Sequence, residues 1–219
     1  MTVRVHAAGF RRLSAEALAE WSLVDAAGAS DCLERAMAMD GGVQAVGTAT
    51  RIVGQARTVR CMVGDNSALH VALNQIQTGD VIVADAGGFL GAAVWGGLMT
   101  HAAMRKGAKG LVIDGAVRDR AEIRDLGFPC FARGVVPGGP HKNFGGAIDA
   151  PISCGGVAVR PGDIVIGDED GVAIVPFERA EETLAAFKSL KQREADVLAA
   201  LDRGEALSDH YGSPKWEKA

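Results

Sequence analysis

An arginine and an aspartate stand side by side just after a short apolar run at residues 111–113. Arg118 offers a planar guanidinium that can pair with a substrate carboxylate. Asp119 offers the hard oxygen ligand that Mg²⁺ takes together with water and substrate. The same pair could also be a surface ion pair at the start of a helix, where an acidic residue is favourable. The spacing alone therefore leaves both a binding site and a helix cap open.

A second carboxylate, Glu194, interrupts the apolar face of a long helix predicted over residues 178–203. At 100° per residue its apolar positions form one stripe, and Glu194 lies near the centre of that stripe. These positions are Leu184, Phe187, Leu190, Val197, Leu198 and Leu201. A carboxylate on an apolar face is costly unless it is paired. We expect Glu194 to form an ion pair, or to reach another subunit or an active site.

Other patterns that could carry chemistry are weaker. The glycine-rich segment 87–97 follows a predicted strand, but Ala86 stands where a dinucleotide-binding loop needs its first glycine. The five histidines form no HExxH pair, and no G-x-S-x-G motif accompanies them. The four cysteines form no CxxC pair and match no zinc spacing, which favours reduced, buried thiols.

The elements that must position these groups alternate between helix and strand through the middle of the chain. We predict helices at 13–26 (capped by Ser14), 30–39 (capped by Ser30), 67–76, 98–106 (ended by Gly107), 119–126 and 178–203. Predicted strands cover 57–63, 81–84, 111–113, 129–132, 157–159, 164–166 and 172–175. Residues 137–146 are too rich in glycine and proline for regular structure and predict a surface loop. The hairpins of the third quarter predict an α/β fold with a mixed central sheet.

Composition narrows the class of protein. The chain has 219 residues, 48% of them hydrophobic, which suits one globular domain over 1–219 with a core at about 13–205 and a tail at 206–219. The net charge is −4 and no basic stripe is visible, so we expect no nucleic-acid partner. No segment has 18 unbroken apolar residues and the first residues contain no apolar signal core. We therefore expect a cytoplasmic protein with no membrane partner.

Several strings, taken together, resemble the RraA-like family. This family includes 4-hydroxy-4-methyl-2-oxoglutarate/4-carboxy-4-hydroxy-2-oxoadipate aldolases and the ribonuclease-E regulator RraA. The strings are GDN (64–66) with His70 four residues on, QTGD (77–80), VWGGLM (94–99), VIDGAVRD (112–119), PGD (161–163) and DEDGV (168–172). The resemblance covers residues 13–205 and implies a swivelling α/β/β sandwich that assembles as a homotrimer or a dimer of trimers.

The resemblance also implies an activity and a set of site residues. It implies a Mg²⁺- or Mn²⁺-dependent lyase that releases pyruvate from a small 2-oxo acid, often with oxaloacetate decarboxylase activity. Arg118 would bind the pyruvyl carboxylate and keto oxygens, and Asp119 would be the metal ligand. Asn66 would lie in the same pocket, the amides of Leu98 and Met99 would hold the carboxylate at a helix start, and Glu194 would reach in from a neighbouring subunit.

One position departs from the family pattern. The family's aldolases carry D-x20-R-D, and counting back from Arg118 gives Gly97 in place of the aspartate. That aspartate helps to deprotonate the substrate alcohol, and loss of a general base typically costs about 10²- to 10⁴-fold in rate. His70, or a loop group such as His141, could serve instead. The alternative is a non-catalytic, protein-binding regulator of the RraA type, although those regulators lack the Arg-Asp pair.

Overall fold

The sheet at the centre of the computed structural model is organised around its long strand β3 (Ile52–Cys61). The structure describes residues 2–212 and 217. One edge of β3 pairs in parallel with β4 (Asp80–Asp85), which continues in parallel to β6 (Gly110–Val117) and β7 (Cys130–Val135). The other edge pairs antiparallel with two strands that come much later in the chain. The sheet is therefore mixed, as predicted.

Two strands share the second edge of β3. Its first half pairs with β11 (Ile164–Asp168) and its second half with β8 (Gly146–Ile148). β11 forms a hairpin with β12 (Gly171–Val175), and β8 pairs with β1 (Val3–Val5). The short strands β5 (Ala93–Trp95) and β2 (Gln44–Ala45) pair with β6 and β7.

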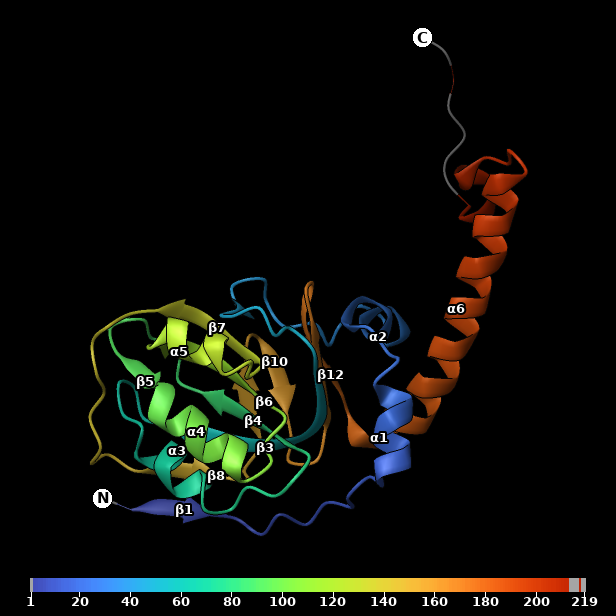
Figure 1. Ribbon diagram of the computed structural model, residues 1–219. Helices are drawn as coiled ribbons and strands as arrows, with labels where there is room; N and C mark the ends of the chain where they lie inside the picture. Colours follow the sequence, from blue (N-terminus) through green and yellow to red (C-terminus); the bar gives the residue numbers. More distant parts are fainter. Residues whose placement is uncertain (1, 213–216, 218–219) are drawn as a thin grey trace.

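One layer covers each face of this sheet, so that the fold has three layers in all (Figure 1). One face carries α3 (Ser67–Ala72), α4 (Gly97–Arg105) and α5 (Arg120–Asp125) over a core that includes Leu69, Ile82 and Ile113. The other face packs against the hairpin of β9 (Ile152–Cys154) and β10 (Val157–Val159). This arrangement is the predicted α/β/β sandwich.

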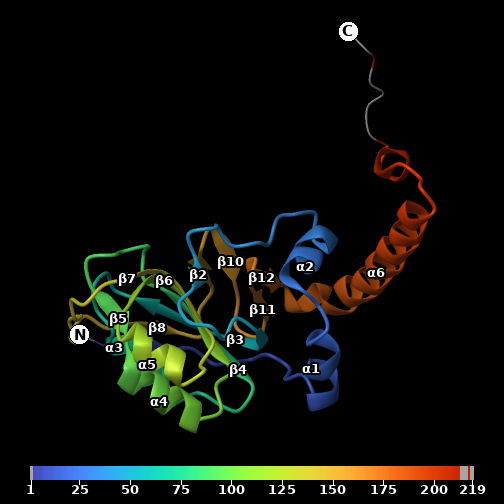
Figure 2. The same cartoon turned by 45° about the horizontal axis from the view of Figure 1, so that its top comes forward.

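The flanking helices gather at the β11–β12 end. They are α1 (Ala15–Trp21), α2 (Ala26–Cys32) and α6 (Ala180–Asp202), with short 3-10 turns at Phe177–Arg179 and Leu207–His210. The far part of α6 extends away from the body in both views (Figures 1 and 2). None of the helices in residues 2–212 combines the length and the apolar character needed to cross a membrane.

Several sequence-based boundaries need correction. The helix predicted at 30–39 is wrong: α2 spans Ala26–Cys32, and Asp25 caps it by accepting a hydrogen bond from Gly28 N at 2.6 Å. It cannot continue because Glu34 and Arg35 both adopt left-handed backbone angles, with φ of 61° and 63°. Ser14 does cap α1, but this helix ends at Trp21 rather than near residue 26. β1, β2, β5 and β8 were not predicted because such short strands are fixed by partners distant in the sequence. β9 was not predicted either, although its partner β10 follows it directly.

Candidate functional site

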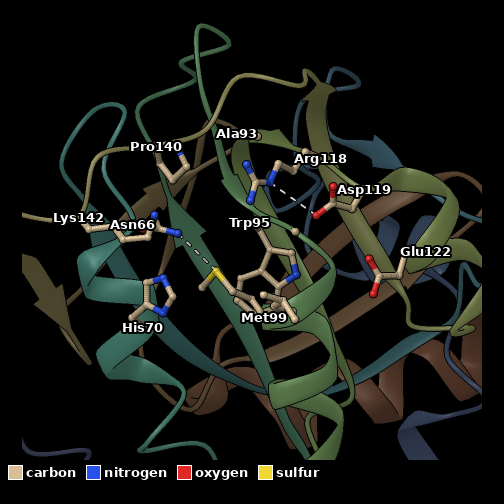
Figure 3. Close-up of a pocket in the computed structure, with 12 residues that line it drawn as sticks. Asn66, His70, Ala93, Trp95, Met99, Arg118, Asp119, Glu122, Pro140 and Lys142 are labelled. Carbon is tan, nitrogen blue, oxygen red and sulfur yellow. Dashed lines mark hydrogen bonds and ion pairs between the residues drawn. The ribbon is translucent and has the colours of Figure 1, made fainter.

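A cavity of about 380 Å³ opens between the start of α4, the start of α5 and the helix α3. This volume suits a small-molecule ligand. Figure 3 shows the side chains that surround it. The lining residues are Asn66, His70, Ala93, Trp95, Gly96, Leu98, Met99, Arg118, Asp119, Glu122, Pro140 and Lys142. The predicted residues Arg118, Asp119, Asn66, His70, Leu98 and Met99 therefore lie around one cavity.

Arg118 and Asp119 follow directly on the end of β6. The backbone of Arg118 is fixed by a hydrogen bond from its amide to Trp95 O at 2.9 Å. Its Nε lies 3.5 Å from Asp119 Oδ2, and both side chains are about half-exposed. Asp119 has a left-handed backbone with φ of 57°, which a non-glycine residue adopts only where the surroundings impose it.

The Asp119 carboxylate does not cap its own helix. Although Asp119 occupies the N-cap position of α5, its side chain makes no capping hydrogen bond there. Oδ2 instead accepts a hydrogen bond from Gly97 N at 2.9 Å, at the start of α4. Within residues 2–212, Oδ1 has no hydrogen-bond partner. Asp119 therefore does not cap α5 but binds the first residue of α4, and its role as a metal ligand stays a prediction.

The start of α4 supplies backbone N–H groups to the same cavity. The first turn of a helix has N–H groups without intrahelical acceptors, and the positive end of the helix dipole favours anions there. The Gly97 N–H donates a hydrogen bond to Asp119, while Leu98 and Met99 line the cavity. The expectation that their amides hold a carboxylate stays a prediction.

The opposite wall is formed by α3 and the loop 137–146. Asn66 Nδ2 donates to Val94 O at 3.1 Å, while its buried Oδ1 has no partner among the described residues. His70 lies on the same wall, close enough to Lys142 for its charge to act on the ring (Figure 3). Burial, and then the charge of Lys142, lower the pKa of His70. A lowered pKa keeps this ring neutral at pH 7.

Hydrogen bonds to Asp65 and its neighbours fix the loop 137–146 over the cavity. The buried Asp65 Oδ2 accepts from the amides of Asn143 and Phe144 at 2.7 and 3.0 Å. Ser67 donates to Asp65 Oδ1 through its amide at 2.8 Å, and its hydroxyl accepts from Gly145 N at 3.0 Å. The segment has no regular structure before β8, as predicted. These contacts position Pro140 and Lys142 at the cavity.

Two predicted site residues lie elsewhere in this chain. Glu194 is on α6, at the other end of the molecule (Figure 1), and pairs with Lys191 at 2.9 Å. The ion pair is one of the alternatives predicted from the sequence. His141 does not line the cavity: its ring packs against Phe144 with centroids 5.3 Å apart, and its backbone bonds to Gly64 and Asn66.

Sequence reasoning missed Glu122, which lines the cavity beside Asp119. Its Oε1 lies 3.1 Å from His101 Nε2, so the pair links α5 to α4. The spacing was a usable signal, because residues three apart on a helix face the same side. Glu122 follows Asp119 by three positions.

The donor set of the cavity suits a hydrated divalent ion more than a tightly ligated one. No group of three or more His, Cys, Asp or Glu side chains that could hold a metal occurs in residues 2–212. Mg²⁺, however, is commonly held by one or two carboxylates, with water and substrate as its other ligands. Asp119, with one oxygen unpaired and a half-exposed side chain, fits this requirement.

Comparisons with known proteins point to one family. The family model described as RraA-like, Aldolase/RraA, matches residues 22–174. A Halalkalibacterium halodurans protein with the name "Putative 4-hydroxy-4-methyl-2-oxoglutarate aldolase" is 38% identical over 181 residues, 83% of each chain. The crystal structure of an uncharacterized Pseudomonas syringae protein matches with a TM-score of 0.79 and 28% identity over 92% of this chain and 99% of that one. Streptomyces coelicolor RraAS2, described as an unusual member of the RNase ES inhibitor RraA family, matches with a TM-score of 0.78 and 30% identity over 86% and 98%.

Proposed function

This chain belongs to the RraA-like family, and from that premise we propose that it is an aldolase-type lyase that depends on a divalent metal and releases pyruvate. The substrate class is a small 4-hydroxy-2-oxo acid, oxaloacetate, or both. The observation that carries this proposal is the Asp119 carboxylate, which leaves its own helix to face the cavity beside Arg118. The name of the H. halodurans relative supports the same reaction class.

Asp119 would hold the Mg²⁺ or Mn²⁺ ion through its unpaired oxygen. The hydrogen bond from Gly97 N fixes the other oxygen, so the carboxylate is oriented before any ligand arrives. When bound, the ion would supply a Lewis acid that draws electron density toward the 2-keto oxygen of the substrate. The uncompensated acceptor Asn66 Oδ1 on the facing wall adds a group that orients a hydroxyl or water donor.

Arg118 would bind the pyruvyl end of the substrate. Its guanidinium is a planar fork that suits a carboxylate and an adjacent keto oxygen, and its backbone is fixed by the bond to Trp95. The free amides of the first turn of α4, at Leu98 and Met99, would complete the carboxylate site. Holding both substrate groups aligns the bond that breaks with the keto group that accepts its electrons.

Glu194 and the oligomer form a further part of the proposal. The free end of α6 carries Leu198, 61% exposed, and Leu201, 36% exposed, on a helix that leaves the body of the chain. Apolar side chains on such a helix favour burial against another subunit. We propose that a homotrimer or dimer of trimers covers this helix and brings Glu194 toward a neighbouring site. Light scattering that gives a monomeric mass would contradict it.

The deciding experiment measures pyruvate release from oxaloacetate and from 4-hydroxy-4-methyl-2-oxoglutarate, with Mg²⁺ and with EDTA. We expect Mg²⁺-dependent release that Asp119→Ala abolishes and that Asp125→Asn, an exposed substitution on the same helix, leaves intact. No metal-dependent pyruvate from either compound would refute the proposal. It would favour a non-catalytic, protein-binding role, the class suggested by the description of the S. coelicolor neighbour.

A further inference from the structure

Two adjacent glycines leave the space into which two carboxylates enter. A Cβ on Gly96 would lie 2.5 Å from Asp119 Oδ2. A Cβ on Gly97 would overlap the carboxylate of Glu122, with Oε1 only 2.8 Å away. Neither glycine has the left-handed backbone that favours this residue; Gly96, for instance, is extended at φ −164°. Glycine at these two positions therefore provides room rather than backbone freedom.

Glu122 is held in that space by one hydrogen bond and keeps one oxygen available. Its Oε1 pairs with His101 Nε2 at 3.1 Å, and Oε2 has no partner within residues 2–212. His101 comes one turn after Gly97 on α4, so the helix that makes room for the carboxylate also orients it. The Glu122 side chain is about half-exposed and points into the cavity, toward Trp95 (Figure 3).

The proposed retro-aldol reaction needs a group that takes the proton of the substrate hydroxyl. Arg118 and Lys142 are cations, and Asp119 is assigned to the divalent ion. His70 is neutral but lies across the cavity from Arg118 and Asp119, whereas Glu122 is on their side (Figure 3). Glu122 is therefore the carboxylate on the wall where the reacting groups would lie.

We propose that Glu122, positioned by His101, is the catalytic base of the retro-aldol step; this inference rests on the proposed function. Glu122 takes the proton from the C4 hydroxyl, and the O–H electron pair becomes the new C4 carbonyl bond. The C3–C4 bond breaks, and its electron pair passes into the enolate of pyruvate. Protonated Glu122 then returns the proton to C3, which completes the methyl group of pyruvate and restores the carboxylate.

If Glu122 has this role, Gly97 would not by itself abolish the reaction. The residue at 97 has no side chain, but the space beside its Cα is filled by a carboxylate from α5. The carboxylate thus comes from a different element and arrives at the same wall of the cavity. A Cβ at 97 would require the Glu122 carboxylate to move from its present position.

Activity on two substrates distinguishes the role of Glu122 from the roles of the other site residues. Oxaloacetate decarboxylation breaks a carbon–carbon bond without removing a hydroxyl proton, so it does not need this base. We expect Glu122→Gln to lower retro-aldol kcat by about 10²- to 10⁴-fold and to change oxaloacetate decarboxylation by less than about threefold. Asp125→Asn, on the same helix but outside the cavity, is the matched control and should change neither. A Gly97→Asp/Glu122→Ala double variant should recover part of the retro-aldol rate that Glu122→Ala loses.

Binding measurements give a second readout that does not depend on turnover. Calorimetry with Mn²⁺, and with oxalate in the presence of Mn²⁺, should give affinities for Glu122→Gln within about threefold of the parent. An unchanged retro-aldol rate in Glu122→Gln would overturn the assignment, and so would a parallel loss of both activities and of Mn²⁺ and oxalate binding. A parent protein with neither activity would instead refute the proposed function, and this inference with it.

Discussion

Replacement of the buried Asp65 tests how the cavity is closed. Its Oδ2 accepts from the amides of Asn143 and Phe144, and its Oδ1 from the amide of Ser67. In Asp65→Asn the side chain keeps its size, but one of its two acceptor sites becomes an N–H₂ donor. Whichever way the amide turns, it faces at least one backbone N–H that it cannot accept.

The expected loss follows from these hydrogen bonds. A hydrogen bond to a charged group contributes about 1.5–3 kcal/mol, and a buried donor left unpaired costs about 1–3 kcal/mol. Because the loop amides are only partly buried, we expect the free energy of unfolding to fall by about 2–3 kcal/mol. For a chain of this size that corresponds to a decrease in Tm of about 4–12 °C. The KM for any substrate should rise as well, since the loop carries Pro140 and Lys142 to the cavity.

The pH dependence has a defined sign. Burial alone would raise the pKa of Asp65, but hydrogen bonds from Ser67, Phe144 and Asn143 outweigh it and lower the pKa. The stabilisation is therefore fully present above the unfolded pKa, about 4, and is lost as the pH falls through the lower folded pKa. The difference in stability between the parent and Asp65→Asn should be constant from pH 5 to 7 and shrink below about pH 4.

The assay combines thermal unfolding with hydrogen exchange at the loop amides. Asn143→Ala is the matched control, because its side chain makes none of these bonds and its backbone N–H remains. We expect faster exchange at Asn143 and Phe144 in Asp65→Asn only. A Tm within about 1 °C of the parent, with unchanged exchange at both amides, would refute the claim that Asp65 holds the loop.

Three further substitutions or reagents probe other parts of the chain. Gly96→Ala should weaken Mn²⁺ binding, measured by calorimetry, by about 10- to 100-fold, because the added Cβ displaces Asp119. Gly138→Ala is the control, because a Cβ at this position would contact only Gly91 O, at 3.5 Å. A thiol reagent should modify Cys32 alone in the native protein, because Cys32 is partly exposed whereas the other three thiols are buried, which raises the pKa of Cys61 and Cys130 to about 12; rapid reaction of two or more would contradict this. Leu198→Lys should lower the mass measured by light scattering if α6 is buried between subunits, whereas an unchanged mass would place the interface elsewhere.

The parallel part of the fold could be predicted because local patterns determine it. The runs at 81–84 and 111–113 are apolar and bounded by turn residues, and both lie within strands of the sheet. Because Arg118 and Asp119 follow the second of these runs closely, their place at a strand–helix junction could also be predicted. β1 and β8 could not, because each is only three residues long and exists through pairing with a distant partner.

The sequence indicates the part of the site that depends on residue types. It does not indicate the part that depends on how neighbouring helices pack. Asp119 and Arg118 could be identified from the sequence because it places a carboxylate next to a guanidinium. Glu122 does not, because its position in the cavity depends on the missing Cβ of Gly97, which only the packing of α4 against α5 makes visible. The prediction of a helix at 30–39 was wrong for a related reason. Ser30 is a residue type that often caps helices, but in the structure Asp25 caps α2.

The order in which the two edges of β3 find their partners has a consequence for folding during synthesis. β4, β6 and β7 follow β3 closely and can pair as they emerge, so one edge is covered early. The other edge stays unpaired until β8 (Gly146–Ile148) and β11 (Ile164–Asp168) have been synthesised. A ribosome stalled before residue 146 would therefore hold an apolar strand with unpaired N–H and C=O groups, which is a template for aggregation. Premature termination in this interval should yield insoluble protein, and folding to the native sheet should be completed only when the last third of the chain is released.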